Sequence, residues 1–91
     1  MAVSKIGEFA KSKAGHDKDK IYVIINIEGE YVYLVDGKIR LIANPKKKKL
    51  KHIQPINSYH EELFHKLQNG EMIRDEDIKR AIKLYNSGIQ K

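Results

Sequence analysis

The chain contains no cysteine, which excludes disulfide bonds, cysteine-ligated zinc fingers and thiol catalysis. No apolar run approaches the roughly 20 residues that a membrane-spanning helix needs. Residues 1–10 lack the long apolar segment of a signal peptide, so we expect a cytoplasmic protein. At 91 residues the chain is one small domain, or a small domain with an appendage. So small a core argues against a deep enzyme cleft with a closing lid.

Catalytic motifs are missing as well. The sequence shows no Ser/His/Asp set and no glycine loop of the Walker type. His60 and His65 superficially resemble a zinc metalloprotease pair, but residues i and i+5 point about 140° apart around a helix. Asp75, Glu76 and Asp77 can bind a divalent ion, yet a helix start explains them more simply. The sequence therefore predicts that the protein is not an enzyme and needs no metal, cofactor or small-molecule substrate.

Positive charge is abundant and unevenly distributed. Eighteen Lys and Arg residues oppose twelve Asp and Glu residues, giving a net charge of +6. Residues 1–57 hold 12 basic and 6 acidic side chains, whereas residues 58–91 hold 6 of each. The whole excess lies in the first part of the chain, which makes that part a candidate for binding a polyanion such as nucleic acid.

The first part of the chain has the pattern of short strands. Asp36–Gly37 between apolar segments is a strong hairpin signal, and Glu28–Gly29 predicts another turn. Both faces of the segment 21–27 are apolar, which is typical of a small closed or half-closed barrel. Pro55 cannot donate to a ladder and is expected to end the last strand. We expect five strands, near residues 8–12, 21–27, 31–35, 39–42 and 50–54.

The period changes after Pro55 and predicts two helices. The first is expected to begin with Ser58 as its N-cap, paired with Glu61 in a capping box, and to stop at Asn69–Gly70. Asp75 is expected to cap the second, which ends at residues 86–88. The apolar faces should pack on each other or on the strands; they comprise Leu63, Phe64 and Leu67, and Ile78, Ala81, Ile82 and Tyr85. Lys79, Arg80 and Lys83 occupy the rest of the second helix.

Residues 7–24 combine a strand, a basic loop containing glycine and a second apolar strand. This stretch resembles a KOW motif, with the pattern Ser-x-Ala-Gly-Arg-Asp-Lys-Gly-Lys-x-Tyr-Val-Val. The residues that fit are Ser12, Ala14, Gly15, Asp17, Lys18, Lys20, Tyr22 and Val23. Segments 35–40 and 45–52 resemble the Val-Asp-Gly turn and the Lys-rich segment of the same families. These are the KOW-type large-subunit ribosomal proteins of archaea and eukaryotes and small bacterial KOW-domain RNA-binding proteins.

The resemblance implies a mainly β fold: an SH3-like KOW barrel of about five strands over residues 2–56, with a C-terminal two-helix extension over residues 57–91. Two positions depart from the pattern. His16 stands in place of Arg and Asp19 in place of Gly, and both changes lower the positive character of the loop. The helices resemble no part of the ribosomal proteins.

The function that the resemblance implies is binding of structured RNA, foremost ribosomal RNA or the large ribosomal subunit. Gly15 lets the backbone approach a phosphate, and the nearby lysines supply charge. The alternatives are a solvated hairpin for the loop, and a disordered charged loop or a nuclear-localisation-like patch for the lysine run 46–49. The RNA-binding candidates are Lys11, Lys13, Gly15, His16, Lys18, Lys20, Arg40, Lys46, Lys47, Lys48, Lys49, Lys51 and His52.

Three tyrosines, Tyr22, Tyr31 and Tyr33, can stack on unpaired bases, but packing on the strands is the better interpretation of each. Alternation puts Tyr31 and Tyr33 on one face. A rival function is a protein-interaction module of the transcription or translation machinery. It would dock through the neutral, amphipathic helices.

Overall fold

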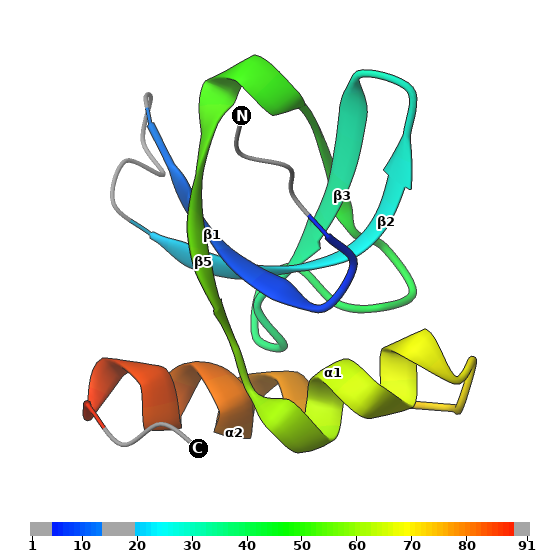
Figure 1. Ribbon diagram of the computed structural model, residues 1–91, viewed down its shortest axis with the longest axis vertical. Helices are drawn as coiled ribbons and strands as arrows, with labels where there is room; N and C mark the ends of the chain where they lie inside the picture. Colours follow the sequence, from blue (N-terminus) through cyan, green and yellow to red (C-terminus); the bar gives the residue numbers. More distant parts are fainter. Residues whose placement is uncertain (1–4, 14–19, 89–91) are drawn as a thin grey trace.

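Five strands form a single antiparallel sheet in the computed structural model, which describes residues 5–13 and 20–88. The strand order is β4-β3-β2-β1-β5, so β5 returns to pair with the first strand of the chain. Within the described residues β4 and β5 are the edges, and the sheet is not closed. Figure 1 shows the sheet curled above a layer of two helices. The strands are β1 (Glu8–Ser12), β2 (Ile21–Glu28), β3 (Tyr31–Val35), β4 (Lys46–Lys49) and β5 (Ile53–Tyr59).

The first three strands lie where the sequence predicts them. The two-residue connection Gly29–Glu30 joins β2 to β3, with Glu28 paired to Tyr31 and Gly29 at φ 62°. Register shifts occur between Ile24 and Asn26 and between Glu8 and Ala10. Such irregularities bend a strand and increase its twist, and they help the sheet to curl.

The two faces of the sheet are both buried, as the apolar pattern of residues 21–27 indicates. Consecutive residues of β1, β2 and β3 point to opposite sides of the sheet. The inner cluster consists of Ala10, Tyr22, Ile24, Val32, Leu34 and Ile53. The outer cluster combines Phe9, Val23 and Val35 of the sheet with Leu63, Ile78 and Ala81 of the helices. The helices therefore complete the core on the outer face of the sheet.

The prediction of a strand at residues 39–42 is wrong, because the side chain of Asp36 bends the chain into a turn. Its Oδ1 accepts hydrogen bonds from the backbone N–H groups of Lys38, Ile39 and Arg40, at 2.9, 3.0 and 2.9 Å. Gly37 has φ 79°, and its N–H donates to the carbonyl of Arg40. Asp-Gly thus forms a turn, but not the predicted hairpin, and residues 37–45 form a loop with one isolated bridge, Leu41 to Asn44.

The fourth strand is the lysine run itself. Lys46–Lys49 pairs with Tyr31–Leu34, so the interpretation of this run as a disordered charged loop is wrong. A short 3-10 turn, η2 (Leu50–His52), follows, and the last strand begins only at Ile53. β5 continues past Pro55 to Tyr59, contrary to the predicted end. An edge strand tolerates proline because one of its sides needs no ladder partner.

The two helices are α1 (Glu61–Gln68) and α2 (Asp75–Asn86). Their C-terminal ends are as predicted, since Gly70 and Gly88 have φ 72° and 82°. Their predicted N-caps are wrong. The N-cap of α1 is His60, whose Nδ1 accepts from the Leu63 N–H, because Ser58 belongs to β5. The N-cap of α2 is Arg74, whose N–H donates to Asp77.

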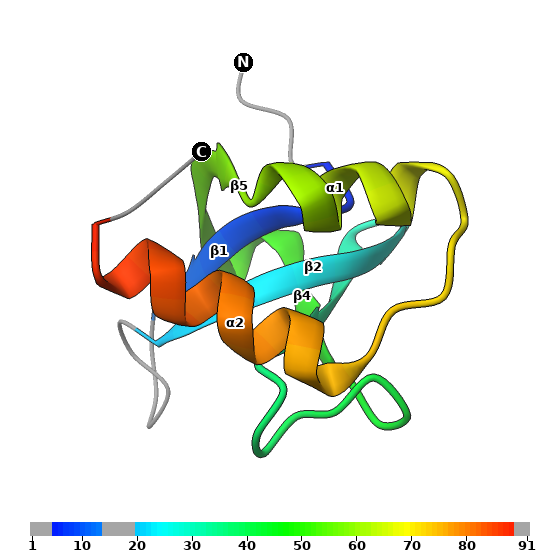
Figure 2. The same cartoon turned by 90° about the horizontal axis from the view of Figure 1, so that it is seen from below.

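The helices pack on the sheet, as the apolar faces predict. Figure 2 shows both of them lying across the same side of the sheet. Leu63, Ile78 and Ala81 are almost completely buried there, and a Phe9–Tyr85 ring contact of 4.9 Å joins β1 to α2. The radius of gyration is 11.8 Å. No helix in the described ranges is long and apolar enough to cross a membrane.

Candidate nucleic-acid interface

The curl of the sheet brings the lysines of its edge strand β4 near η2 and Lys13, the residue that follows β1. We call this surface the basic edge; it consists of Lys13, Lys46, Lys47, Lys48, Lys49, Lys51 and His52. Gly15, His16 and Lys18 of the predicted site lie outside the described residues. Lys11, Lys20 and Arg40 lie elsewhere in the described part of the structure.

Pairing with β3 divides the β4 lysines between two faces. Lys46 and Lys48 stand opposite Leu34 and Val32, which belong to the inner cluster. Lys47 and Lys49 stand opposite Tyr33 and Tyr31, on the other face. Alternation along one extended strand therefore presents ammonium groups to both sides of the sheet edge.

On the outer face, Lys47 lies over two tyrosine rings. Its Nζ is 4.5 Å from the ring centroid of Tyr31 and 6.0 Å from that of Tyr33. The Tyr33 hydroxyl donates to Glu28 at 2.8 Å, and this hydrogen bond raises the pKa of the tyrosine. Both rings are half-buried and share one face, as alternation predicts. Tyr22 is only 1% exposed, so it packs in the inner cluster and is not free to stack on a base.

On the inner face, Lys48 reaches across the sheet to β1. Its Nζ donates to the Ser12 hydroxyl at 2.7 Å, although Ser12 is completely buried. Partial burial lowers the pKa of Lys46, and repulsion from Lys48 lowers it further. Lys46 and Lys48 stand on the same face of β4, so their ammonium groups repel each other and a bound anion would relieve that repulsion.

The ends of β1 and η2 are held beside each other. The Lys13 N–H donates to the carbonyl of His52 at 3.2 Å, and the Lys13 Nζ donates to the carbonyl of Lys51 at 3.4 Å. Lys13, Lys51 and His52 are all exposed. Residues distant in sequence thus extend the charge of β4 to the end of β1.

The remaining predicted residues are engaged in other contacts. Lys20 forms an ion pair of 3.1 Å with Asp36. Burial acts to raise the pKa of Asp36, but the backbone hydrogen bonds and the Lys20 ammonium outweigh it, so this pKa lies below its ordinary value. The Arg40 N–H belongs to the turn around the same carboxylate. Lys11 is half-buried in β1, paired with Ile21 on one side and Gln54 on the other.

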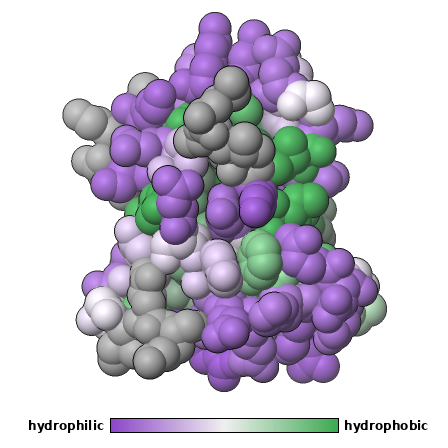
Figure 3. Space-filling model, viewed as in Figure 1, coloured by the Kyte–Doolittle hydropathy of each residue, from purple (hydrophilic) through white to green (hydrophobic). Residues whose placement is uncertain are grey.

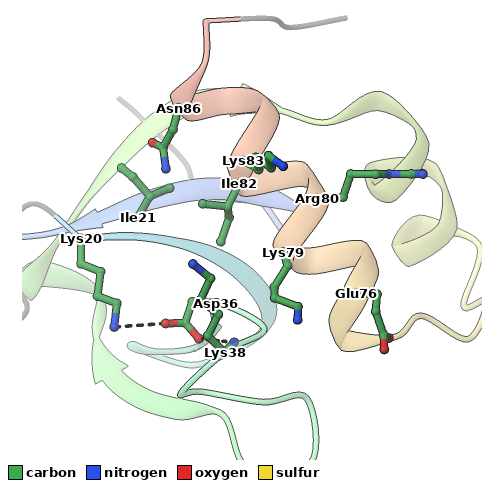
Figure 4. Close-up of a pocket in the computed structure, with 10 residues that line it drawn as sticks. All are labelled: Lys20, Ile21, Asp36, Lys38, Glu76, Lys79, Arg80, Ile82, Lys83 and Asn86. Carbon is green, nitrogen blue, oxygen red and sulfur yellow. Dashed lines mark hydrogen bonds and ion pairs between the residues drawn. The ribbon is translucent and has the colours of Figure 1, made fainter.

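A second group of cations surrounds a pocket that the sequence interpretation did not identify. We call it the α2 pocket; it is lined by Lys20, Ile21, Asp36, Lys38, Glu76, Lys79, Arg80, Ile82, Lys83 and Asn86. Figure 4 shows α2 on one side, with the start of β2 and the loop after β3 on the other. Only Lys20 was among the candidates. Lys79 and Lys83 share a helix face by their i, i+4 spacing, but the sequence did not indicate what faces them.

Hydrophilic side chains dominate the surface. On the face that Figure 3 shows, they cover most of the helical layer and the opposite end of the molecule, with hydrophobic surface in patches between them.

Comparison with protein-family models gives no match for this chain, and comparison with curated proteins gives none.

Proposed function

We propose that the protein binds RNA and that the basic edge is its principal contact surface. The observation that carries the proposal is the run Lys46–Lys49, held as an edge strand with ammonium groups on both faces and two tyrosines beside it. Alternate residues of a strand are about 6.6 Å apart, which is comparable to the spacing of neighbouring phosphates in an extended nucleic acid. An ordered strand presents these charges at fixed positions.

The chemistry of the edge suits backbone binding with little choice of sequence. Lysine acts as a point charge toward phosphate, and phosphate contacts supply affinity and orientation. Tyr31 and Tyr33 are half-buried on the face of Lys47 and Lys49, where an unpaired base can stack. We therefore propose that the RNA includes a loop or another unpaired segment.

We further propose that the sheet is an SH3-like KOW module and that ribosomal RNA is the foremost target. Support comes from the resemblance of residues 7–24, 35–40 and 45–52 to KOW proteins, and from the return of β5 to the side of β1, as in a half-closed barrel. The protein would then act in the cytoplasm as a ribosome-associated factor without catalytic activity.

The rival function, docking of a protein through the helices, loses its main support. It rested on an amphipathic helical surface that could fold against a partner. Leu63, Ile78 and Ala81 are already buried against the sheet, so the apolar faces of both helices are largely occupied.

Paired charge substitutions test the proposal. Lys47→Gln with Lys49→Gln removes two charges from the basic edge, and Lys66→Gln with Arg74→Gln removes two charges from the helical part. We expect the first variant to bind a labelled RNA hairpin about tenfold more weakly, and the second to bind within about twofold of the unmodified protein. Thermal unfolding of both variants is the check that they remain folded. Equal losses in the two variants would show that net charge, rather than the basic edge, governs binding.

A further inference from the structure

The α2 pocket combines an apolar wall with a cationic rim. Its volume is about 790 Å³, within the range of small-molecule sites in proteins. Ile21 and Ile82 face the middle of the pocket in Figure 4, and the side chain of Asn86 points toward Ile21. The lining includes five basic and two acidic side chains, so the pocket favours an anionic ligand with an apolar part.

The cations of the rim differ in what they contact. Lys20 is paired with Asp36, and Arg80 points away from the pocket, pairing with Glu62 of α1 at 3.3 Å. Among the described residues, no ion pair engages Lys38, Lys79 or Lys83. These last three ammonium groups are the ones available to a ligand.

Tight contacts hold the wall of the pocket formed by the loop after β3. A Cβ on Gly37 would lie 2.5 Å from the carbonyl oxygen of Asp75 and 2.7 Å from Lys79 Cγ, so the loop touches the first turns of α2. The Ile42 N–H donates to Asp75 Oδ1 at 2.8 Å, which ties the loop to α2 a second time. These contacts between the loop and α2 fix the two walls of the pocket relative to each other. A ligand would therefore bind with little rearrangement of the loop or the helix.

The end of β1 lies between the α2 pocket and the basic edge. The Ser12 N–H donates to the carbonyl of Lys20 at 3.1 Å, which places the last residue of β1 beside a residue of the pocket wall. The next residue, Lys13, bonds to His52 of the basic edge. The wall of the α2 pocket and the basic edge are therefore neighbours where β1 ends and β2 begins.

We propose that the α2 pocket receives a single nucleotide of the bound RNA. The base lies on Ile21 and Ile82, and the phosphate lies between Lys79 of the helix and Lys38 of the loop; Lys83, one turn further along α2, adds positive charge at the rim. The Asn86 amide, which carries both donors and an acceptor, faces the base edge. This inference rests on the proposed RNA binding and adds a site of nucleotide recognition to a surface that otherwise contacts only the backbone.

Amide chemical shifts of the intact, isotope-labelled protein test this inference. We expect a short unpaired RNA to shift the amides of Lys79, Ile82 and Lys83 together with those of the basic edge. Adenosine monophosphate alone, at millimolar concentration, should shift only the pocket amides, and weakly. The variant Lys79→Ala with Lys83→Ala should bind the RNA about fivefold more weakly, while Lys66→Ala, of the same helical layer but outside the pocket, should bind like the unmodified protein.

Each outcome separates this inference from the proposed function. RNA that shifts only the basic edge would overturn the pocket assignment and leave RNA binding intact. Pocket amides that respond to the mononucleotide but not to RNA would assign the pocket to a free nucleotide, which also overturns the inference. RNA that shifts no amide at all would overturn the proposed function, and the inference with it.

Discussion

The basic edge and the α2 pocket carry similar charge in different settings. The basic edge spreads its lysines along an exposed strand, on two faces, with tyrosine rings beside one of them. The α2 pocket places its lysines around the apolar residues Ile21 and Ile82, between a helix and a fixed loop. An open row of ammonium groups provides affinity for any phosphate backbone, whereas a walled site can also discriminate between bases.

The two regions also differ in how much their residues contribute to the stability of the fold. Lys13, Lys47 and Lys51 of the basic edge are exposed and contribute little to the folded state, whereas Lys46 and Lys48 are half-buried and Lys48 donates to the buried Ser12. The walls of the α2 pocket depend on Asp36, Gly37 and the packing of α2 on the sheet, which are parts of the fold itself. Substitutions of the exposed lysines of the edge should therefore change binding alone, and substitutions in the walls should change stability as well.

The largest expected effect comes from removing the helices. A chain shortened to end at Asn57 loses one wall of the pocket, the last two residues of β5 and the buried side chains Leu63, Ile78 and Ala81. Their burial contributes on the order of 5 kcal/mol, out of a total that is about 5–15 kcal/mol for small domains. We expect the shortened chain to lose cooperative unfolding in circular dichroism. A sharp transition at the original temperature would show that the sheet is stable alone.

A methyl group at Gly37 should have the next largest effect. Gly37 has φ 79° and stands against the backbone of α2, so Gly37→Ala should lower the free energy of unfolding by about 2–3 kcal/mol. Gly29→Ala is the matched control, because Gly29 has φ 62° but no atom within 4 Å of its Cβ position. We expect it to cost about 1 kcal/mol. Equal losses in urea denaturation would contradict the contact between the loop and α2.

Acid should remove the contribution of Asp36. Because its pKa in the folded protein lies below the ordinary 3.8, its charge stabilises the fold above that pH, and this stability disappears as the pH falls through the folded pKa. We expect Asp36→Asn to cost about 1–2 kcal/mol at pH 7, since lost hydrogen bonds to a charged group have that magnitude. The difference between the two proteins should shrink toward pH 2. A difference that stays constant would show that the carboxylate charge is irrelevant.

The smallest effect is expected at Glu62. Its carboxylate lies 3.3 Å from Arg80 and 3.9 Å from Lys66, and all three side chains are substantially exposed. Exposed ion pairs contribute little, so Glu62→Gln should change the free energy of unfolding by less than about 0.5 kcal/mol. A larger loss in urea denaturation would mean that the packing of α1 on α2 depends on this contact.

Local patterns predicted much of the fold. The strands at 8–12, 21–27 and 31–35 follow from alternation, and the turn at Gly29 and the helix ends at Gly70 and Gly88 follow from residues that adopt positive φ. The predicted strand at 39–42 does not form, because the Asp36 carboxylate accepts hydrogen bonds from three successive backbone N–H groups. Alternation alone does not show which side chain competes with a ladder for backbone hydrogen bonds.

The candidate site was predictable only where its residues are neighbours in the sequence. The run Lys46–Lys49 is apparent from composition, although its charge concealed that it is a strand. The α2 pocket is lined by Lys20, Lys38 and Lys79, which are far apart in the chain. The even charge balance of residues 58–91 gives no indication of a cationic surface on α2. Only the packing of α2 against the sheet brings these cations together.

The salt dependence of RNA affinity tests most directly whether the basic edge binds phosphates. If the protein neutralises about five phosphates, log affinity should fall against log salt with a slope of roughly −3.5 to −4.5. Replacing Lys46, Lys47, Lys48 and Lys49 with Gln should reduce the magnitude of that slope by about 2 or more, because each lost phosphate contact removes a little under one unit. The account predicts that flattening in a variant that still unfolds cooperatively. An unchanged slope would contradict it and place the phosphate contacts on another part of the protein.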